Sequence, residues 1–152
     1  ISATVNSVAI TQTAAVTVTP AAASTATTQI TASPTTASTD GGSATITVQL
    51  RDAFSNNLTT GPVTVALNAT GGNLSAVTNN ANGTYTATLT ATVAGAIGID
   101  GTIDGSPIAD TATVTFVAGA ISAANSTVQI APTSIAASSG SAQSTVTVTV
   151  RD

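Results

Sequence analysis

Apolar and polar residues alternate along several short stretches of the chain. The clearest run is Ala44-Thr45-Ile46-Thr47-Val48-Gln49-Leu50, and Val63-Thr64-Val65-Ala66-Leu67 has the same two-residue period. A period of two predicts strands with one buried face. The apolar spacing of a helix persists nowhere, so the pattern predicts an all-β chain. With Gly, Asn, Asp and Pro turn signals as boundaries, strands are expected at roughly 27–33, 43–51, 62–68, 84–93, 97–104 and 109–117, with a short extra one near 73–78.

The same alternation predicts which side chains face the core. Burying one Leu or Ile contributes about 1.5–3 kcal/mol, so a dozen large residues suffice for a marginal domain. Threonines at the alternate positions, such as Thr45, Thr47, Thr86, Thr88, Thr113 and Thr115, are expected to face solvent. The expected inward set is Ile30, Ile46, Val48, Leu50, Val63, Val65, Leu67, Tyr85, Ala87, Leu89, Ile97, Ile99, Ile103, Val114 and Phe116.

The first part of the sequence is repeated near its end. Ile1–Ser7 matches Ile99–Gly105 and 13–18 matches 111–116; Gln29-Ile30 then matches Gln129-Ile130, and 43–52 matches 143–152. A period near 100 residues is the size of a small β domain. The sequence therefore predicts tandem domains: 1–20 as the C-terminal strands of one repeat, 21–119 as a complete repeat, and 120–152 as the N-terminal strands of the next. The short linkers between them predict a rod.

Six or seven short strands in about a hundred residues favour one architecture, the Ig-like Greek-key β-sandwich. Composition then narrows the function. Charged residues make up 5% of the chain, His and Cys are absent, and every charged residue is Asp or Arg. Without imidazole, thiol or amine side chains, catalysis is not expected. Two basic residues give no patch for nucleic acid, and no apolar run approaches the ~20 residues that insertion in a membrane needs. No cofactor is expected.

The stretch 44–105 resembles a known family. It contains Val48-Gln49-Leu50-Arg51-Asp52, then Gly71-Gly72-Asn73-Leu74-Ser75, then Asn82-Gly83-Thr84-Tyr85, and finally Ile103-Asp104-Gly105. This order is similar to the bacterial Ig-like tandem repeat of the invasin/intimin type. The resemblance implies a sandwich that is repeated in the stalk of extracellular adhesins on the bacterial surface. The family's loop after the second strand usually reads Asp-x-x-Gly-Asn, whereas Ser55 takes the Gly place here.

Two sets of charged residues are candidates for a site. Asp52 recurs as Asp152 beside a recurring Arg, so we expect Arg51 and Asp52 to organise the loop that follows the second strand, with the Asp accepting backbone N–H groups and the Arg pairing with a carboxylate. Asp100 and Asp104 are the best candidates for calcium ligands. They become Ser2 and Asn6 in the preceding repeat, which favours roles in turns instead.

Three functions fit these observations. The leading hypothesis is a non-enzymatic spacer in the stalk of an extracellular adhesin, whose partners are the neighbouring Ig-like repeats. The alternative is a subunit of an extracellular filament or sheath, in which copies of the chain join by strand pairing. A module that binds carbohydrate or a receptor is the weakest of the three, because the chain has no Trp and one Tyr to stack on sugars.

Overall fold

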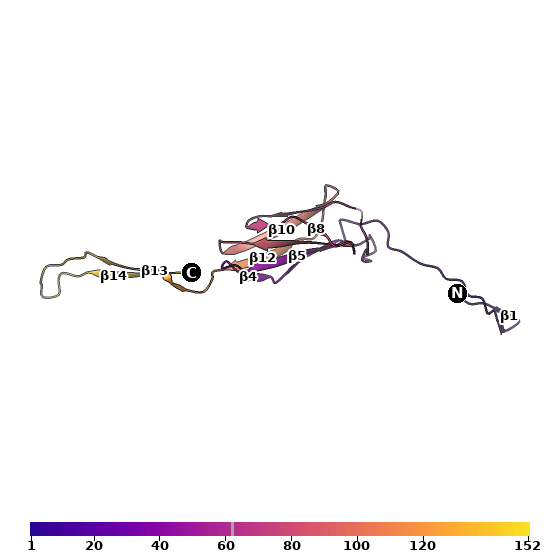
Figure 1. Cartoon of the computed structure of the whole chain (residues 1–152), viewed down its shortest axis with the longest axis horizontal. Helices are drawn as coiled ribbons and strands as arrows, with labels where there is room; N and C mark the ends of the chain where they lie inside the picture. The colour runs from indigo at the N-terminus through magenta and orange to yellow at the C-terminus, as the bar shows by residue number, and fades with distance from the viewer. Residues whose placement is uncertain (62) are drawn as a thin grey trace.

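The computed structural model describes residues 1–61 and 63–152, and it is built from strands that lie along one long axis. Figure 1 shows a two-layer bead in the middle of the chain, with a short hairpin towards each terminus. The strands are β1 (Thr4–Val5), β2 (Val8–Ala9), β3 (Gln29–Ser33), β4 (Thr36–Ser38), β5 (Ser43–Gln49), β6 (Val65–Ala69), β7 (Asn73–Leu74), β8 (Thr78–Asn79), β9 (Thr84–Thr90), β10 (Gly95–Ile103), β11 (Ser106–Pro107), β12 (Ala112–Val117), β13 (Ser122–Ala131) and β14 (Thr145–Arg151).

The bead consists of two sheets. In the first sheet β5 lies between β3 and β9, and β9 also pairs with the short strands β7 and β8. In the second sheet β10 pairs with β6, β12 and β11, and β4 pairs with β12 in parallel. The chain therefore passes from the first sheet to the second between β3 and β4, and returns with β5. This exchange links the two layers and confirms the predicted Ig-like sandwich.

The core lies between these sheets, as the alternation predicts. The predicted inward residues are buried except for Val63 and Leu67, which are half-buried and pack against the core. The structure adds Ala37, Ala44, Ala91 and Ile108 to the buried set. Alanine gives only a weak hydrophobic signal, and Ala37 belongs to a strand that the pattern did not indicate.

The strands differ from the predicted ones mainly where they are short. β4 and β11 were not predicted, because strands of two or three residues carry no readable period. The extra strand expected near 73–78 is two separate strands, β7 and β8, and both pair with β9. The strand predicted over 62–68 corresponds to β6, which begins at Val65; residue 62 lies outside the described residues.

Both terminal hairpins repeat pairs from the bead. The pairs Thr4↔Ala9 and Val5↔Val8 correspond to Thr102↔Pro107 and Ile103↔Ser106. In the other hairpin Val128↔Val148 corresponds to Ile30↔Val48.

This second correspondence corrects the predicted match of Gln29-Ile30 to Gln129-Ile130. The offset is 98 residues through the first strand of the pair and 100 in the second. The two extra residues therefore lie in the loop between the strands, where an insertion leaves the ladder intact.

Candidate functional site

Asp52 is the most constrained charged residue of the bead. It follows β5, and its side chain is 1% exposed. Its Oδ1 accepts hydrogen bonds from the backbone N–H of Phe54 and of Asn56, both at 2.9 Å. Its Oδ2 accepts from the Asn56 side-chain amide and from the backbone N–H of Ala21, both at 3.0 Å. The carboxylate therefore holds the loop after β5 in place. Through Ala21 it also holds residues 20–24, the linker that leads into the bead and is called the entry segment below.

These bonds also set the charge state of Asp52. The hydrogen bond from the Asn56 side chain, together with those from the three backbone N–H groups, outweighs the cost of burial and lowers the pKa of Asp52 to about 2. The group is therefore ionised at neutral pH, as an acceptor of four hydrogen bonds should be. Ser55 completes the turn with a φ of 67°, and its N–H donates to the carbonyl of Asp52 at 2.9 Å. It thus adopts the left-handed conformation that the glycine of the family pattern would supply.

Arg51 serves the same loop through a different partner from the expected one. Its Nε donates to Oδ1 of Asn57 at 2.9 Å, so the side chain pairs with an amide and not with the predicted carboxylate. Its backbone N–H donates to Oγ1 of Thr28 at 3.2 Å, and its carbonyl accepts from the N–H of Ser24 at 2.7 Å. Arg51 and Asp52 together hold the entry segment against the end of β5.

Asp152 occupies the matching place in the C-terminal hairpin, directly after β14. Its Oδ2 accepts a hydrogen bond from the backbone N–H of Gly119 at 2.8 Å. It also lies 3.3 Å from the hydroxyl of Thr39, which belongs to the bead. The N–H of Gly119 is the first cause of the lowered pKa of Asp152. Sequence reasoning noted that this Asp recurs, but the contact with the linker depends on two segments far apart in the sequence.

The calcium candidates Asp100 and Asp104 share no centre, since one lies within β10 and the other in the turn after it. Asp104 sits in the turn between β10 and β11, where its Oδ1 accepts from the N–H of Thr64 at 2.8 Å. Asp100 is exposed within β10, opposite Asn68. Across residues 1–61 and 63–152, no group of three or more His, Cys, Asp or Glu side chains is placed to hold a metal ion. Calcium binding stays a prediction, which a calcium titration followed by thermal unfolding would test.

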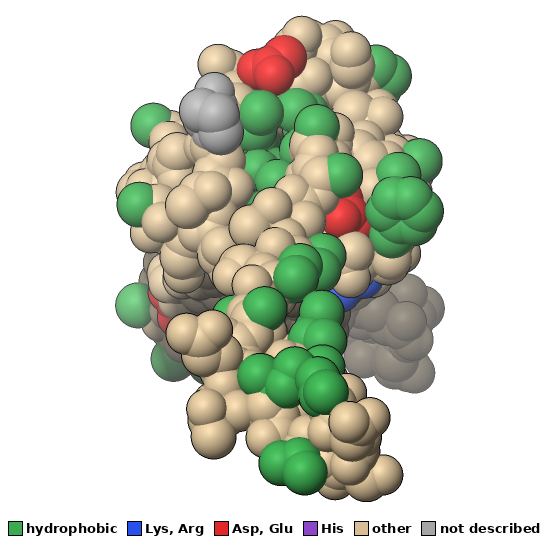
Figure 2. Space-filling model, turned by 90° about the vertical axis from the view of Figure 1, so that its right-hand side faces the viewer, with side chains coloured by type: hydrophobic (Ala, Val, Ile, Leu, Met, Phe, Trp, Pro, Cys, Tyr) green, Lys and Arg blue, Asp and Glu red, His purple; other side chains and the backbone are tan. Residues whose placement is uncertain are grey.

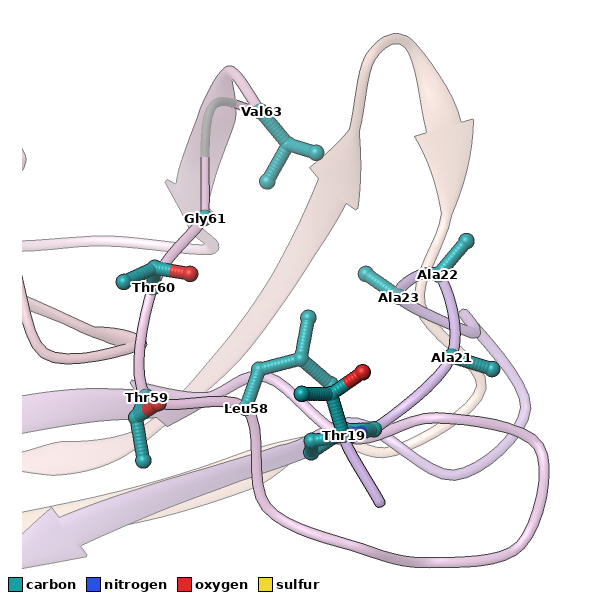
Figure 3. Close-up of a pocket in the computed structure, with 10 residues that line it drawn as sticks. Thr19, Ala21, Ala22, Ala23, Leu58, Thr59, Thr60, Gly61 and Val63 are labelled. Carbon is teal, nitrogen blue, oxygen red and sulfur yellow. The ribbon is translucent and has the colours of Figure 1, made fainter. Parts of the chain in front are cut away.

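A groove of about 490 Å³ lies where the entry segment meets the bead. Figure 3 shows Ala21, Ala22 and Ala23 on one side of it, with Leu58 between them and the stretch that carries Thr60. The hydroxyl of Tyr85 lies 2.9 Å from the carbonyl of Gly61 and 2.8 Å from that of Val63. Tyr85 was predicted as a core residue, and its second role at this loop was missed because it joins two segments far apart in the sequence.

The surface carries few charged side chains at the end of the bead where the entry segment arrives. In the view of Figure 2, apolar side chains lie scattered among uncharged polar atoms, with few Asp or Arg between them. Phe54, within the loop that follows Asp52, is 79% exposed. Within the described part of the chain, no helix has the length and apolar character that crossing a membrane would require.

Comparisons with known proteins agree with this architecture. The family model for invasin domain 3 matches residues 24–119, which is more than half of the chain. The chain belongs to the invasin domain 3 family. Its matched range includes the complete sandwich and ends at Gly119, the linker residue that contacts Asp152.

Solved structures of bacterial adhesins resemble this invasin-type chain. Invasin, described as a bacterial integrin-binding protein, is 28% identical with a TM-score of 0.64, over 72% of this chain and 23% of that one. The Yersinia pseudotuberculosis adhesin InvE is 30% identical with a TM-score of 0.62, over 72% of this chain and 31% of that one. The Escherichia coli adhesin FdeC is 25% identical with a TM-score of 0.63, over 90% of this chain and 44% of that one.

The chain thus spans less than half the length of each of these structures. A search among curated proteins finds no match. What the comparisons establish is an Ig-like domain of the invasin type.

Proposed function

We propose that this chain is a non-enzymatic spacer segment in the stalk of a bacterial surface adhesin, outside the cell. The observation that supports the proposal is an arrangement found on both sides of the bead, which we call the joint. A backbone N–H of the linker meets Oδ2 of the strand-end Asp on both sides of the bead, at Ala21 and at Gly119. The same hydrogen bond at each boundary would keep consecutive domains of a stalk in a fixed relative orientation.

The chemistry of the chain supports a passive role. The sequence has no His and no Cys, and its most perturbed carboxylate, Asp52, is fully engaged with four hydrogen-bond donors of its own loop and linker. A carboxylate that is buried and saturated in this way is not free to accept a proton from a substrate. The extended arrangement in Figure 1 suits a spacer, since each bead adds its length to the reach of the protein.

The decisive experiment exchanges the bead within its parent adhesin. Replacing residues 21–119 by an unrelated Ig-like bead of equal length should leave surface display and adhesion unchanged, whereas deleting them should shorten the reach of the stalk in electron micrographs. The matched control is an exchange of a neighbouring repeat. Loss of adhesion on exchange, with the foreign bead folded and displayed, would instead show that this bead carries a binding site.

A filament subunit is the second candidate, supported by the hairpin β13–β14. Its apolar side chains are exposed, at 70% for Val128, 60% for Val148 and 58% for Val146, and an apolar two-stranded ribbon can pair with another chain. Electron microscopy of the purified chain separates the two functions. A uniform polymer at micromolar concentration would favour the filament, and single beaded particles would favour the spacer.

A further inference from the structure

Three hydrogen bonds of the joint around Asp52 recur in the joint around Asp152, beginning with the bonds from Ala21 and Gly119 to Oδ2. The carbonyl of Asp52 accepts from Oγ1 of Thr27 at 2.7 Å, and that of Asp152 accepts from Nδ2 of Asn125 at 2.8 Å. The N–H of Arg51 donates to Oγ1 of Thr28 at 3.2 Å. The N–H of Arg151 donates in the same way to Oγ of Ser126, also at 3.2 Å.

The side chains that serve as partners differ between the two joints, although the geometry is the same. Thr27 corresponds to Asn125, Thr28 to Ser126 and Ala21 to Gly119. The positions therefore preserve a donor or an acceptor and not a residue type. This is the pattern of a mechanical element that is rebuilt at each boundary, rather than of one loop that happens to contain an Asp.

The second joint also shows what the preceding domain contributes. Thr39 lies in the loop between β4 and β5, and its backbone N–H donates to the carbonyl of Val117 at 2.9 Å, which fixes the loop to the end of β12. Its hydroxyl reaches Oδ2 of Asp152 in the next repeat. A groove runs along this boundary, lined by Thr39, Asp40 and Thr92 of one domain and by Ser122, Asn125 and Asp152 of the next.

Gly119 permits this close approach. A Cβ added at Gly119 would lie 2.7 Å from the Cβ of Asp40, closer than carbon atoms of packed side chains come. A side chain at residue 119 would therefore force Asp40 or the linker to shift from the positions they have at this boundary.

We propose that Asp152, the aspartate at the end of β14, is the residue that sets the angle between the bead and the domain that follows it, by receiving the β4–β5 loop of the bead. One oxygen, Oδ2, holds the incoming linker and faces the hydroxyl of the domain before it. The interaction surface is therefore the Thr39–Asp40 loop, and its partner is the next copy of the repeat. This inference rests on the proposed spacer function, and it names the residue that makes the spacer stiff.

Asp152 is the residue to test, because its side chain contacts both the linker, at Gly119, and the loop of the bead, at Thr39. Its replacement in the full chain reports on the joint and leaves the core of the bead untouched.

The test measures the spread of distances across the joint. The chain contains no Cys, so Thr113→Cys and Thr147→Cys place one spin label on the bead and one on the next repeat. In the full chain with Asp152 intact, pulsed electron spin resonance should give one narrow distance distribution. Asp152→Ala should broaden it, and Thr39→Val should broaden it less, because only the longer of the two hydrogen bonds is lost.

Gly119→Ala tests the same joint by adding a methyl group, without changing a charge. Because the new methyl group would displace Asp40, the mean distance should shift while the circular dichroism of the bead stays the same. Asp100→Ala is the matched control: it removes an exposed carboxylate on β10, away from the joint, and should leave the distribution unchanged.

The outcomes separate the two proposals. A narrow distribution that Asp152→Ala leaves narrow would overturn the role of the aspartate and leave the spacer function standing. A broad distribution in the chain with Asp152 intact would overturn both the stiff joint and the form of the proposed function that depends on a rigid rod.

Discussion

The hairpin β13–β14 and the strands β3 and β5 are two copies of one element in different surroundings. Both copies keep the same pairs, with Val128 opposite Val148 as Ile30 is opposite Val48. Their burial differs completely, since Val48 is 0% exposed and Val148 is 60% exposed. Pairing within the element therefore fixes the register, whereas the rest of the sandwich supplies the burial.

The N-terminal hairpin shows even more clearly that local structure sets the register. Asn6 and Ser7 have φ values of 48° and 67°, as Asp104 and Gly105 have 48° and 82°. A two-residue turn with positive φ at both positions matches the twist of paired strands and sets their register by itself. Residues 13–18, the counterpart of β12, form no strand, because the neighbours that hold β12 in the bead are absent from their surroundings.

The largest expected effect comes from giving the exposed copy its missing partners. Adding a copy of residues 53–119 after Asp152 completes the second sandwich. The exposed fraction of Val148 should then fall to nearly that of Val48, and amide exchange in β14 should slow by orders of magnitude because opening would require unfolding of the domain. Cross-strand contacts by nuclear magnetic resonance should still pair Val128 with Val148. A change of register on completion would contradict the claim that pairing is set locally.

Gly83→Ala should destabilise the bead, because the backbone at residue 83 packs closely against the loop that contains Leu58. Gly83 is buried with a φ of 82°, and a Cβ there would overlap the carbonyl oxygen of Leu58. Backbone strain and displacement of this loop together should cost about 3 kcal/mol or more in the free energy of unfolding. Chemical denaturation measures it. Gly140→Ala is the control, because Gly140 has a φ of 95° in open space in the C-terminal hairpin; it should leave the unfolding of the bead unchanged.

Asp52→Asn should weaken the bead in a pH-dependent way. The lowered pKa of Asp52 means that the ionised carboxylate stabilises the fold above about pH 4 and that this contribution is lost as the pH falls through about 2. The unfolding temperature of the variant should therefore lie below that of the parent at pH 5, and the two should converge near pH 2. Thermal unfolding across this range measures the difference.

Asp100→Asn serves as the control for this titration, because Asp100 is exposed within β10. Its unfolding temperature should match that of the parent at pH 5, where Asp52→Asn should lower it. A constant difference between Asp52→Asn and the parent down to pH 2 would show that the carboxylate acts by shape alone.

Gly105→Ala should give the smallest effect, because it strains a turn without a collision. A Cβ at Gly105 would lie in open space, but its φ of 82° is unfavourable for alanine. The expected cost is about 1 kcal/mol, measured by chemical denaturation. The pairs between β10 and β11 should persist, since β10 is also held by β6 and β12. Loss of these pairs would mean that the turn is required even inside the bead.

Much of this architecture could be predicted from the sequence because its cause is periodic. The alternation of residues 44–50 placed β5 and its buried face correctly, and the Asp104-Gly105 turn marked its hairpin. β4 could not be predicted: its three residues carry no period, and it exists because β12 offers a parallel edge. The two-residue insertion was misplaced because Gln29-Ile30 and Gln129-Ile130 are identical, and these two identities outweighed the register of the whole ladder.

For the candidate site, too, the repeated residues could be predicted from the sequence, whereas the contacts between distant segments could not. The recurrence of Asp52 as Asp152 was visible in the sequence, and so was a role in the loop that follows. The bonds to Ala21 and Gly119 were not, because they join segments separated by about 30 residues, and no local pattern shows that these segments meet. The pairing of Arg51 with Asn57 was also missed, since an amide acceptor carries no charge that a sequence pattern would reveal.

The central claim is that residues 21–119 form a bead that is stable by itself, and that the flanking hairpins take their order from pairing and from the joint. Thermal unfolding of the isolated segment 21–119, compared with the full chain, tests this most directly. The account predicts one cooperative transition within about 5 °C of that of the full chain, because the buried core is complete in this segment. A segment that shows no cooperative transition would contradict it.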